Sequence, residues 1–167
     1  MSCSYRIPGS SAIVAITLAA MTLVPALAQD SKSSVDATYQ DIQQTLGTVP
    51  SFFKALPEAG LPGAWAEFKA VQLNPNTKLT GKEKELMGLA VASQIPCHYC
   101  IYFHTAAAKA NGATDDEIRE AVAMAAVVRH WSTVLNGMQV DFDQFKGETD
   151  DVLRLAAEKA KQTSQTK

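Results

Sequence analysis

Residues 79–126 read LTGKEKELMGLAVASQIPCHYCIYFHTAAAKANGATDDEIREAVAMAA, and this stretch decides the fold. It contains TGKE at 80–83 and TDDE at 114–117, two capping boxes in which threonine and glutamate satisfy free backbone N–H groups at the start of a helix. Pro96 interrupts the chain between them, and Asn111-Gly112 is a typical helix end. The stretch therefore predicts three consecutive helices, over about 80–94, 97–111 and from 114 onward.

The rest of the chain also carries helix signals. One helix is predicted over about 34–46 and another over about 62–73. Between them, TVPSFFKALPEAGLPG holds three prolines and two glycines, which predicts two short bent turns or helices. The last stretch, DDVLRLAAEKAKQTSQTK, predicts an amphipathic helix that frays into a polar tail from about residue 160. No segment shows a sustained two-residue alternation, so the predicted fold is all-α.

An apolar segment near the amino terminus, SAIVAITLAAMTLVPALA at 11–28, follows the lone positive charge of Arg6. It ends in small residues of the kind that a signal peptidase accepts. We therefore predict a signal peptide over residues 1–28, one helical domain over 29–167, and a periplasmic or secreted protein. The alternative is an uncleaved anchor, for which the apolar segment is short.

Charge and cysteine content narrow the functional classes. Removing Arg6 from the 15 basic residues leaves 14 against 17 acidic residues, a net charge of −3. No basic patch suggests nucleic acid, and no second apolar run suggests stable membrane insertion. Cleavage also removes Cys3, so Cys97 and Cys100 are the cysteines that remain. A bridge between residues so close in sequence stabilises little as a staple, which favours redox chemistry.

The cysteine pair shares a helical face with a histidine. At about 100° per residue, Cys97, Cys100 and His104 lie within about 60° of one another around the helix. Cys97 also stands where the helix begins, and the backbone N–H groups there favour a thiolate. The pair is therefore predicted to be acidic and reactive.

A base and a group that orients it are predicted beside the pair. His104 lies one turn after Cys100, where its imidazole can take the thiol proton or protonate a leaving oxygen. If the helices on either side of Pro96 form an antiparallel hairpin, Glu85 lies beside His104. In this predicted catalytic site Cys100 is the nucleophile and His104 its base. Glu85 orients His104, and Cys97 resolves an oxidised Cys100.

Metal and haem sites are the chemical alternatives. Cys97, Cys100, His104 and Glu85 could supply four zinc ligands, but structural zinc sites normally draw ligand pairs from two separate segments, and here three would crowd one helix. A c-type haem needs histidine directly after the second cysteine, where this chain has Ile101. We predict no metal and no cofactor.

The stretch 79–126 resembles the core of the carboxymuconolactone decarboxylase family, in its alkyl hydroperoxidase AhpD-like branch. The most specific feature is a glutamate, Glu85, twelve residues before a C-x-x-C-x-x-x-H motif. Residues 39–75 are similar to the amino-terminal half of such proteins. The resemblance implies an AhpD-like helical fold with the CxxC motif at the start of a central helix, assembled as a trimer or hexamer.

The resemblance also implies an activity. It indicates an antioxidant peroxidase that reduces a small hydroperoxide with electrons from a thiol reductant or a redox partner protein. Carried over, Cys100 is the peroxidatic residue and Cys97 the resolving one, while His104 and Glu85 form the proton relay. Tyr99 stands where the best-described members place a histidine.

The sequence thus predicts an exported thiol-dependent peroxidase or disulfide oxidoreductase that acts through Cys97 and Cys100. Two alternatives stay open. One is a lyase acting on a lactone acid, like the decarboxylases that give the family its name. The other is a non-enzymatic helical oligomer in which the cysteine pair is a structural disulfide.

Overall fold

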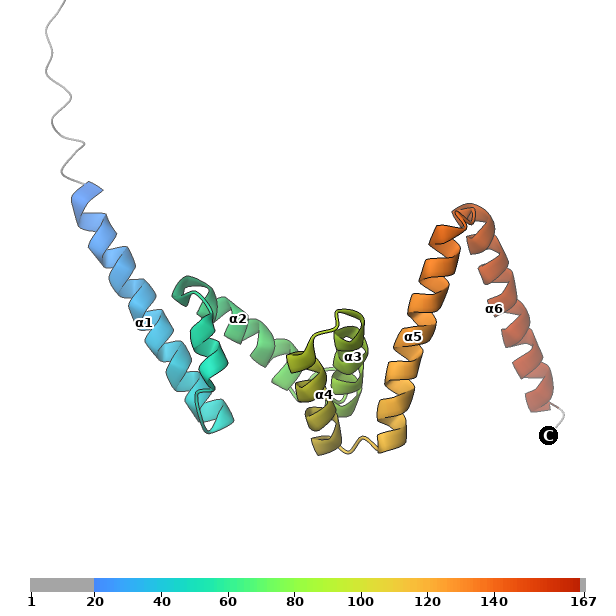
Figure 1. Ribbon diagram of the computed structural model, residues 1–167, viewed down its shortest axis with the longest axis horizontal. Helices are drawn as coiled ribbons and strands as arrows, with labels where there is room; N and C mark the ends of the chain where they lie inside the picture. Colours follow the sequence, from blue (N-terminus) through green and yellow to red (C-terminus); the bar gives the residue numbers. More distant parts are fainter. Residues whose placement is uncertain (1–19, 166–167) are drawn as a thin grey trace, which may run out of the picture. The chain divides into compact units, whose positions relative to one another are not determined.

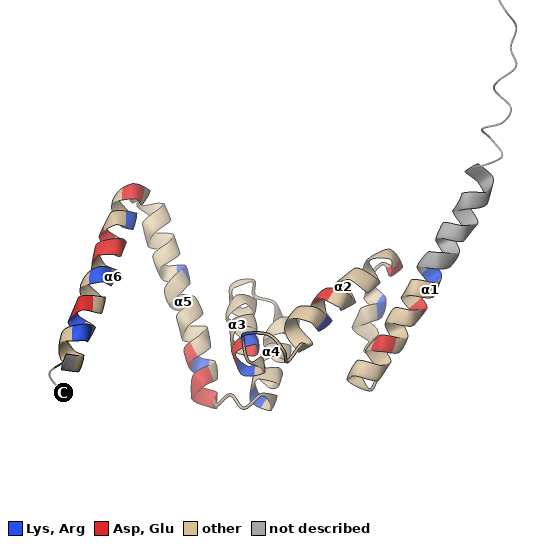
Figure 2. Cartoon of the chain, turned by 180° about the vertical axis from the view of Figure 1, so that it is seen from behind, with Lys and Arg blue, Asp and Glu red and all other residues tan. Residues whose placement is uncertain are grey.

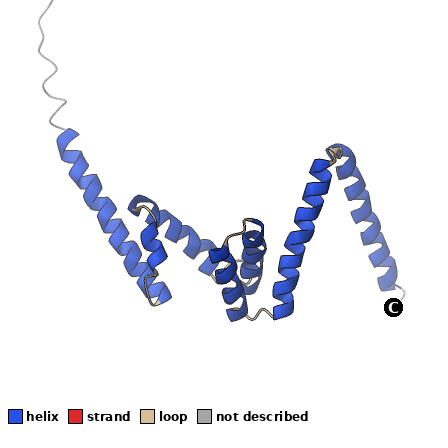
Figure 3. Cartoon of the chain, viewed as in Figure 1, coloured by secondary structure: helices blue, strands red, loops and turns tan. Residues whose placement is uncertain are grey.

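The computed structural model describes residues 20–165, and every regular element in that range is a helix (Figures 1 and 3). The predicted all-α fold is therefore confirmed. The chain divides into two compact units, Met1–Thr77 and Lys78–Lys167. That residues 29–167 form one domain stays a prediction.

The first unit consists of one long helix and a series of shorter ones. The predicted pair of bent turns is confirmed as η1 and η2, and the predicted helix over 62–73 is confirmed as α2 with its continuation η3, whose turns are of the wider π type. The elements are α1 (Ala20–Leu46), η1 (Ser51–Ala55), η2 (Glu58–Gly60), α2 (Leu61–Glu67) and η3 (Phe68–Leu73).

Helix α1 begins earlier than the predicted 34, at Ala20. The signal peptide was predicted over 1–28, and residues 1–19 of that segment lie outside the described residues. Cleavage after Ala28 stays a prediction. No helix among the described residues is both long enough and apolar enough to cross a membrane.

The core of the first unit forms where α1 meets α2. Ile42 and Leu61 are fully buried there and Trp65 nearly so, and each large apolar side chain buried in this way contributes about 1.5–3 kcal/mol. The Trp65 indole N–H donates a hydrogen bond to Asp41 Oδ2 at 2.7 Å. Lys69 Nζ lies 2.7 Å from the other oxygen of Asp41. The apolar core therefore ends in a polar contact that joins the two helices.

The second unit holds the stretch that decided the fold. Its helices are α3 (Gly81–Gln94), α4 (His98–Ala110), α5 (Asp115–Gly137) and α6 (Phe142–Gln165). Both predicted capping boxes are present, at the starts of α3 and α5. Gly112 adopts a left-handed backbone, φ 84°, and ends α4 as predicted. Helix α3 packs against both α4 and α5.

Helix α6 is longer than predicted at both ends. It begins at Phe142 rather than near 150, because Asp141 Oδ1 accepts a hydrogen bond from the Gln144 backbone N–H at 2.8 Å and caps the helix start. It continues to Gln165, beyond the predicted polar tail from 160. Its side chains are exposed, apart from the half-buried Thr149, in the part of the helix for which burial is described.

Charge is unevenly distributed over the second unit. Figure 2 shows acidic residues on the first turn of α5 and both signs along α6, whereas the middle of α5 is nearly free of charge. The alanine-rich middle of α5 includes the buried Ala125, which packs toward α3. The long, uncharged part of α5 also leaves large apolar side chains exposed, including Val128 and Trp131.

Glu117 gives the second unit an acid-sensitive contact. It accepts a hydrogen bond from Lys82 Nζ at 2.7 Å and so joins the starts of α3 and α5. This bond, followed by the bond from the Thr114 backbone N–H, holds the pKa of Glu117 below its ordinary value. A carboxyl group whose pKa is lowered by folding adds stability above its unfolded-state pKa. That stability is lost as the pH falls through the folded-state pKa.

We therefore expect Glu117→Gln to make the acid-side decrease of Tm shallower, while the capping box is kept because glutamine also serves there. The effect is small, since the ion pair is only half-buried and is still screened by water. Thermal unfolding over a series of acidic pH values measures it, with Glu148→Gln on α6 as the surface control. An acid-side slope that stays the same in Glu117→Gln contradicts the expectation.

Candidate functional site

The four predicted site residues come from the hairpin of α3 and α4. Glu85 lies in the first half of α3. Cys97 is the residue immediately before α4, Cys100 is in the first turn of that helix, and His104 is one turn further on. The structure thus places the CxxC motif at the start of a helix, as predicted.

Cys97 and Cys100 are joined by a disulfide, with their Cα atoms 5.3 Å apart. Both residues are half-buried. Cys97 has an extended backbone, and its Sγ accepts a hydrogen bond from the Cys100 backbone N–H at 3.3 Å. A thiolate at this place is favoured by the same N–H group and by the helix dipole. The sulfur of Cys97 therefore takes part in the disulfide and also caps α4.

Two residues between the cysteines point away from them. His98 and Tyr99 are exposed, Tyr99 to 89%. Tyr99 occupies the position at which the resemblance implies a histidine. In this chain the side chain at that position points to solvent, so it does not contribute to the face that carries Cys97 and Cys100.

Glu85 and His104 meet as predicted. Glu85 Oε2 lies 2.7 Å from His104 Nδ1, and Glu85 is only 5% exposed. A buried carboxylate is costly unless it is paired, and the imidazole supplies that partner. A carboxylate only accepts hydrogen bonds, so when Glu85 is ionised this contact has the proton on Nδ1, and Nε2 of the neutral ring is then the basic nitrogen. Glu85 then also stabilises the imidazolium that forms when Nε2 takes a proton.

Two residues that the sequence analysis did not identify hold the chain just before the cysteines. Arg129 on α5 donates from Nε to Gln94 Oε1 at 2.6 Å and from Nη2 to the Gln94 carbonyl at 3.3 Å. Gln94 in turn donates from its side chain to the Ala125 carbonyl. These bonds fasten the end of α3 to α5, three residues before Cys97. Gln94 and Arg129 are 35 residues apart, and the local sequence gives no sign that they meet, beyond a lone arginine in an apolar stretch.

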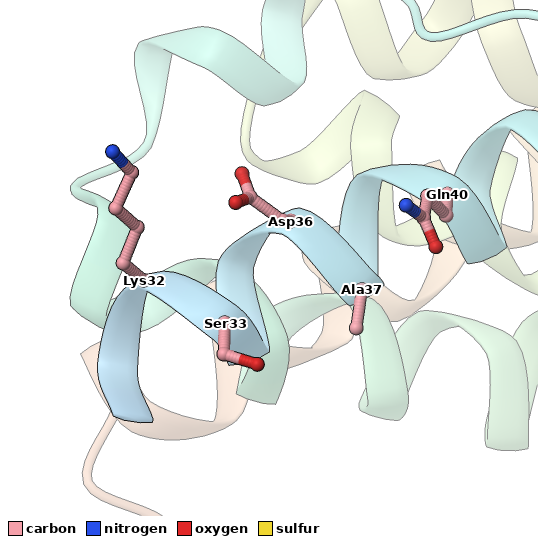
Figure 4. Close-up of a pocket in the computed structure, with 5 residues that line it drawn as sticks. All are labelled: Lys32, Ser33, Asp36, Ala37 and Gln40. Carbon is pink, nitrogen blue, oxygen red and sulfur yellow. The ribbon is translucent and has the colours of Figure 1, made fainter. Parts of the chain in front are cut away.

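No group of three or more histidine, cysteine, aspartate or glutamate side chains within residues 20–165 is arranged to hold a metal ion. An open hollow does occur in the first unit, on the surface of α1, and Figure 4 shows the side chains around it. None of them is a predicted site residue. The hollow is lined by Lys32, Ser33, Asp36, Ala37 and Gln40.

Known proteins resemble this chain in sequence and in fold. The profile of the carboxymuconolactone decarboxylase family matches residues 59–141. The structure is similar to the crystal structure of the alkylhydroperoxidase AhpD core from Rhodospirillum rubrum, at 30% sequence identity and a TM-score of 0.59. That match covers 70% of this chain and 89% of the other. The chain belongs to the carboxymuconolactone decarboxylase family.

Membership of the carboxymuconolactone decarboxylase family, in its AhpD-like branch, confirms the resemblance seen in the sequence. The matched range contains all four predicted site residues together with Gln94 and Arg129. The comparison with the curated proteins gave no match. The all-helical, AhpD-like fold is thus established, and the roles of individual residues stay predictions.

The pairing of Glu85 with His104 can be measured directly. We expect Glu85→Ala to lower the free energy of unfolding by about 1.5–3 kcal/mol, because a hydrogen bond to a charged group is lost. We also expect the fraction of His104 with its proton on Nδ1 to fall. Urea unfolding measures the first effect and 15N chemical shifts of the imidazole the second.

Glu120→Ala, an exposed change on α5, is the control for the Glu85 experiment. It should leave both the unfolding free energy and the His104 shifts unchanged. If Glu85→Ala is as neutral as Glu120→Ala in both measurements, the paired arrangement of Glu85 and His104 is wrong.

Proposed function

We propose that this chain is a thiol-dependent peroxidase or disulfide oxidoreductase that reduces hydroperoxides through Cys97 and Cys100. One observation carries the proposal: a disulfide at the start of α4 stands one helical turn before a histidine that a buried carboxylate orients. The similar protein from Rhodospirillum rubrum is described as an alkylhydroperoxidase core. Its described activity supports the same reaction class for this chain.

The first half of the proposed cycle uses the reduced pair. Nε2 of His104 takes the proton of the Cys100 thiol, and the thiolate attacks one oxygen of the hydroperoxide. The O–O bond breaks, Cys100 becomes a sulfenic acid, and the departing alkoxide takes the proton from His104 to leave as an alcohol. Glu85 balances the charge on the imidazolium between these two proton transfers.

The second half restores the pair. The Cys97 thiol loses its proton, its thiolate attacks the sulfenic sulfur of Cys100, and the hydroxide that leaves takes up that proton as water, which gives the disulfide. A thiol reductant or a redox partner protein then supplies two thiols, becomes oxidised to a disulfide, and returns both cysteines to the thiol form. The N–H bond to the sulfur of Cys97 assists this exchange because it stabilises the thiolate of that residue.

Peroxide consumption with a dithiol tests the proposal. We expect Cys100→Ser to abolish turnover and His104→Gln to lower the rate by about 10²–10⁴-fold, the usual contribution of a positioned acid or base. Without the dithiol, pre-reduced Cys97→Ser should consume about one equivalent of peroxide and stop as the sulfenic acid, because no second cysteine resolves it. Tyr102→Phe, at an exposed position on α4, is the control and should retain the wild-type rate.

Three results would overturn the proposed peroxidase. Full activity in Cys100→Ser contradicts the role of the nucleophile. Turnover of a lactone acid that does not depend on either cysteine indicates the decarboxylase-type lyase that the family name describes. A reduction potential below about −300 mV with unreactive sulfurs indicates a structural disulfide.

We further propose that the protein is exported to the periplasm or secreted. The apolar segment at 11–28 supports this, as does the loss of Cys3 on cleavage, which leaves a single cysteine pair suited to an oxidising compartment. The amino-terminal sequence of the protein recovered from the periplasmic or culture fraction tests it. A first residue of Gln29 is expected, and an intact Met1 in the cytoplasmic fraction contradicts it.

We also propose that copies of the chain associate into a trimer or hexamer. The support is the apolar stripe of α6, made by Phe142, Phe145, Val152 and Leu153, which is exposed along its length. An exposed apolar surface of this size is typical of an interaction site. Leu155 lies on the other side of the same helix, about 160° around the axis from Leu153.

The position of these two leucines gives a matched test of assembly. Light scattering with size-exclusion chromatography should show a smaller species for Leu153→Glu, because a charge is placed in the apolar stripe. Leu155→Glu adds the same charge outside the stripe and should leave the mass unchanged. A wild-type protein that runs as a monomer contradicts the proposed assembly.

A further inference from the structure

Gly88 lies at a position in α3 where glycine lowers the stability of the helix. It lies in the interior of Gly81–Gln94, a helix otherwise rich in leucine, alanine and glutamate. Glycine destabilises a helix interior relative to alanine because its backbone loses more conformational freedom. A glycine kept at such a place indicates that another group approaches the backbone closely.

The group that approaches Gly88 is the imidazole of His104. A Cβ atom placed on Gly88 would overlap three ring atoms of His104, namely Cε1, Nδ1 and Nε2. The obstacle is a ring, and it cannot move aside freely because Nδ1 is bonded to Glu85 at 2.7 Å. Glu85 and Gly88 are three residues apart, so they lie on the same face of α3. The His104 ring is thus hydrogen-bonded to Glu85 and contacts α3 at Gly88.

Most other glycines show no such contact. Of the glycines in residues 20–165, Gly81 also faces a close neighbour, the side chain of Asn111 at the end of α4. At the remaining positions an added Cβ would meet nothing within 4 Å, as at Gly147 on α6. The two close approaches, at Gly81 and Gly88, both lie along the contact of α3 with α4. At both positions the missing side chain leaves room for a side chain of α4 or its C-terminal cap, and at Gly88 that side chain belongs to the candidate site.

We infer that Gly88 is a positioning residue for His104, because its missing side chain provides the space in which the imidazole contacts α3 and bonds to Glu85. A side chain at position 88 pushes the ring off this face. The hydrogen bond from His104 Nδ1 to Glu85 is then stretched or broken, and Nε2 moves away from its position in the intact site. The expected effect of Gly88 on turnover rests on the proposed function. Its expected effect on the stability and on the position of His104 does not.

Gly88→Ala tests the inference, because helix propensity predicts a rise in Tm and displacement of the His104 ring predicts a fall. Propensity alone raises Tm, as it should in the control Gly147→Ala, where space is open. We expect Gly88→Ala to lower Tm instead and to remove the 15N signal of His104 protonated at Nδ1. Peroxide turnover should fall about 100-fold, the scale of a displacement of about 1 Å in an active site.

A double-mutant cycle makes the test specific. In a His104→Ala background the ring is absent, so adding Gly88→Ala should no longer lower Tm and should raise it as Gly147→Ala does. If Gly88→Ala alone does not fold, recovery of folding in the His104→Ala background supports the inference, and failure in both overturns it. A Tm that rises in Gly88→Ala with the His104 signal intact also overturns it.

The failure of this inference is distinguishable from the failure of the proposed function. Wild-type protein without peroxidase activity contradicts the proposed function, while the Tm cycle and the His104 signal still decide the role of Gly88. Full activity in the wild type together with an unchanged rate, Tm and His104 signal in Gly88→Ala contradicts only the role of Gly88.

Discussion

The hydrogen bond between Glu85 Oε2 and His104 Nδ1 is the interaction on which the hairpin of α3 and α4 and the candidate site both depend. A carboxylate that is 5% exposed must have a polar partner, because the cost of an unpaired buried charge is several kcal/mol or more. Only one turn of α4 can bring its imidazole to that carboxylate. The same bond therefore helps to set the register of the two helices and orients the His104 imidazole.

Much of this hairpin can be predicted from local sequence. The capping boxes begin α3 and α5 where the threonines indicate. The spacing of Glu85 from the cysteine motif places it beside His104 once the chain reverses at Pro96. These predictions succeed because a cap or a helix turn involves residues that are near in sequence. Asp141 carries a signal of the same kind, with Gln144 three residues later, and it begins α6 earlier than the apolar pattern alone suggests.

Other parts of the site could not be predicted in this way. The bonds from Arg129 to Gln94 join residues that are far apart in sequence and depend on the packing of α5 against α3. The space at Gly88 is likewise a property of two helices together, and the sequence of α3 shows only that a glycine is present. Membership of the carboxymuconolactone decarboxylase family and its AhpD-like branch fixes the overall arrangement but not these contacts.

The sulfur atom of Cys97 takes part both in the capping of α4 and in the disulfide with Cys100. This Sγ accepts a hydrogen bond from the Cys100 N–H group in the first turn of α4, and the same atom can ionise to a thiolate once the disulfide is reduced. A charged sulfur accepts a hydrogen bond more strongly than a disulfide sulfur does. Order in the first turn of α4 and the reduction of the pair are therefore thermodynamically linked, so that each favours the other by the same free energy. An ordered first turn of α4 thus favours the reduced form of the pair, in which an ionised Cys97 accepts the N–H group most strongly. A ligand that bound only the reduced form would have the same effect.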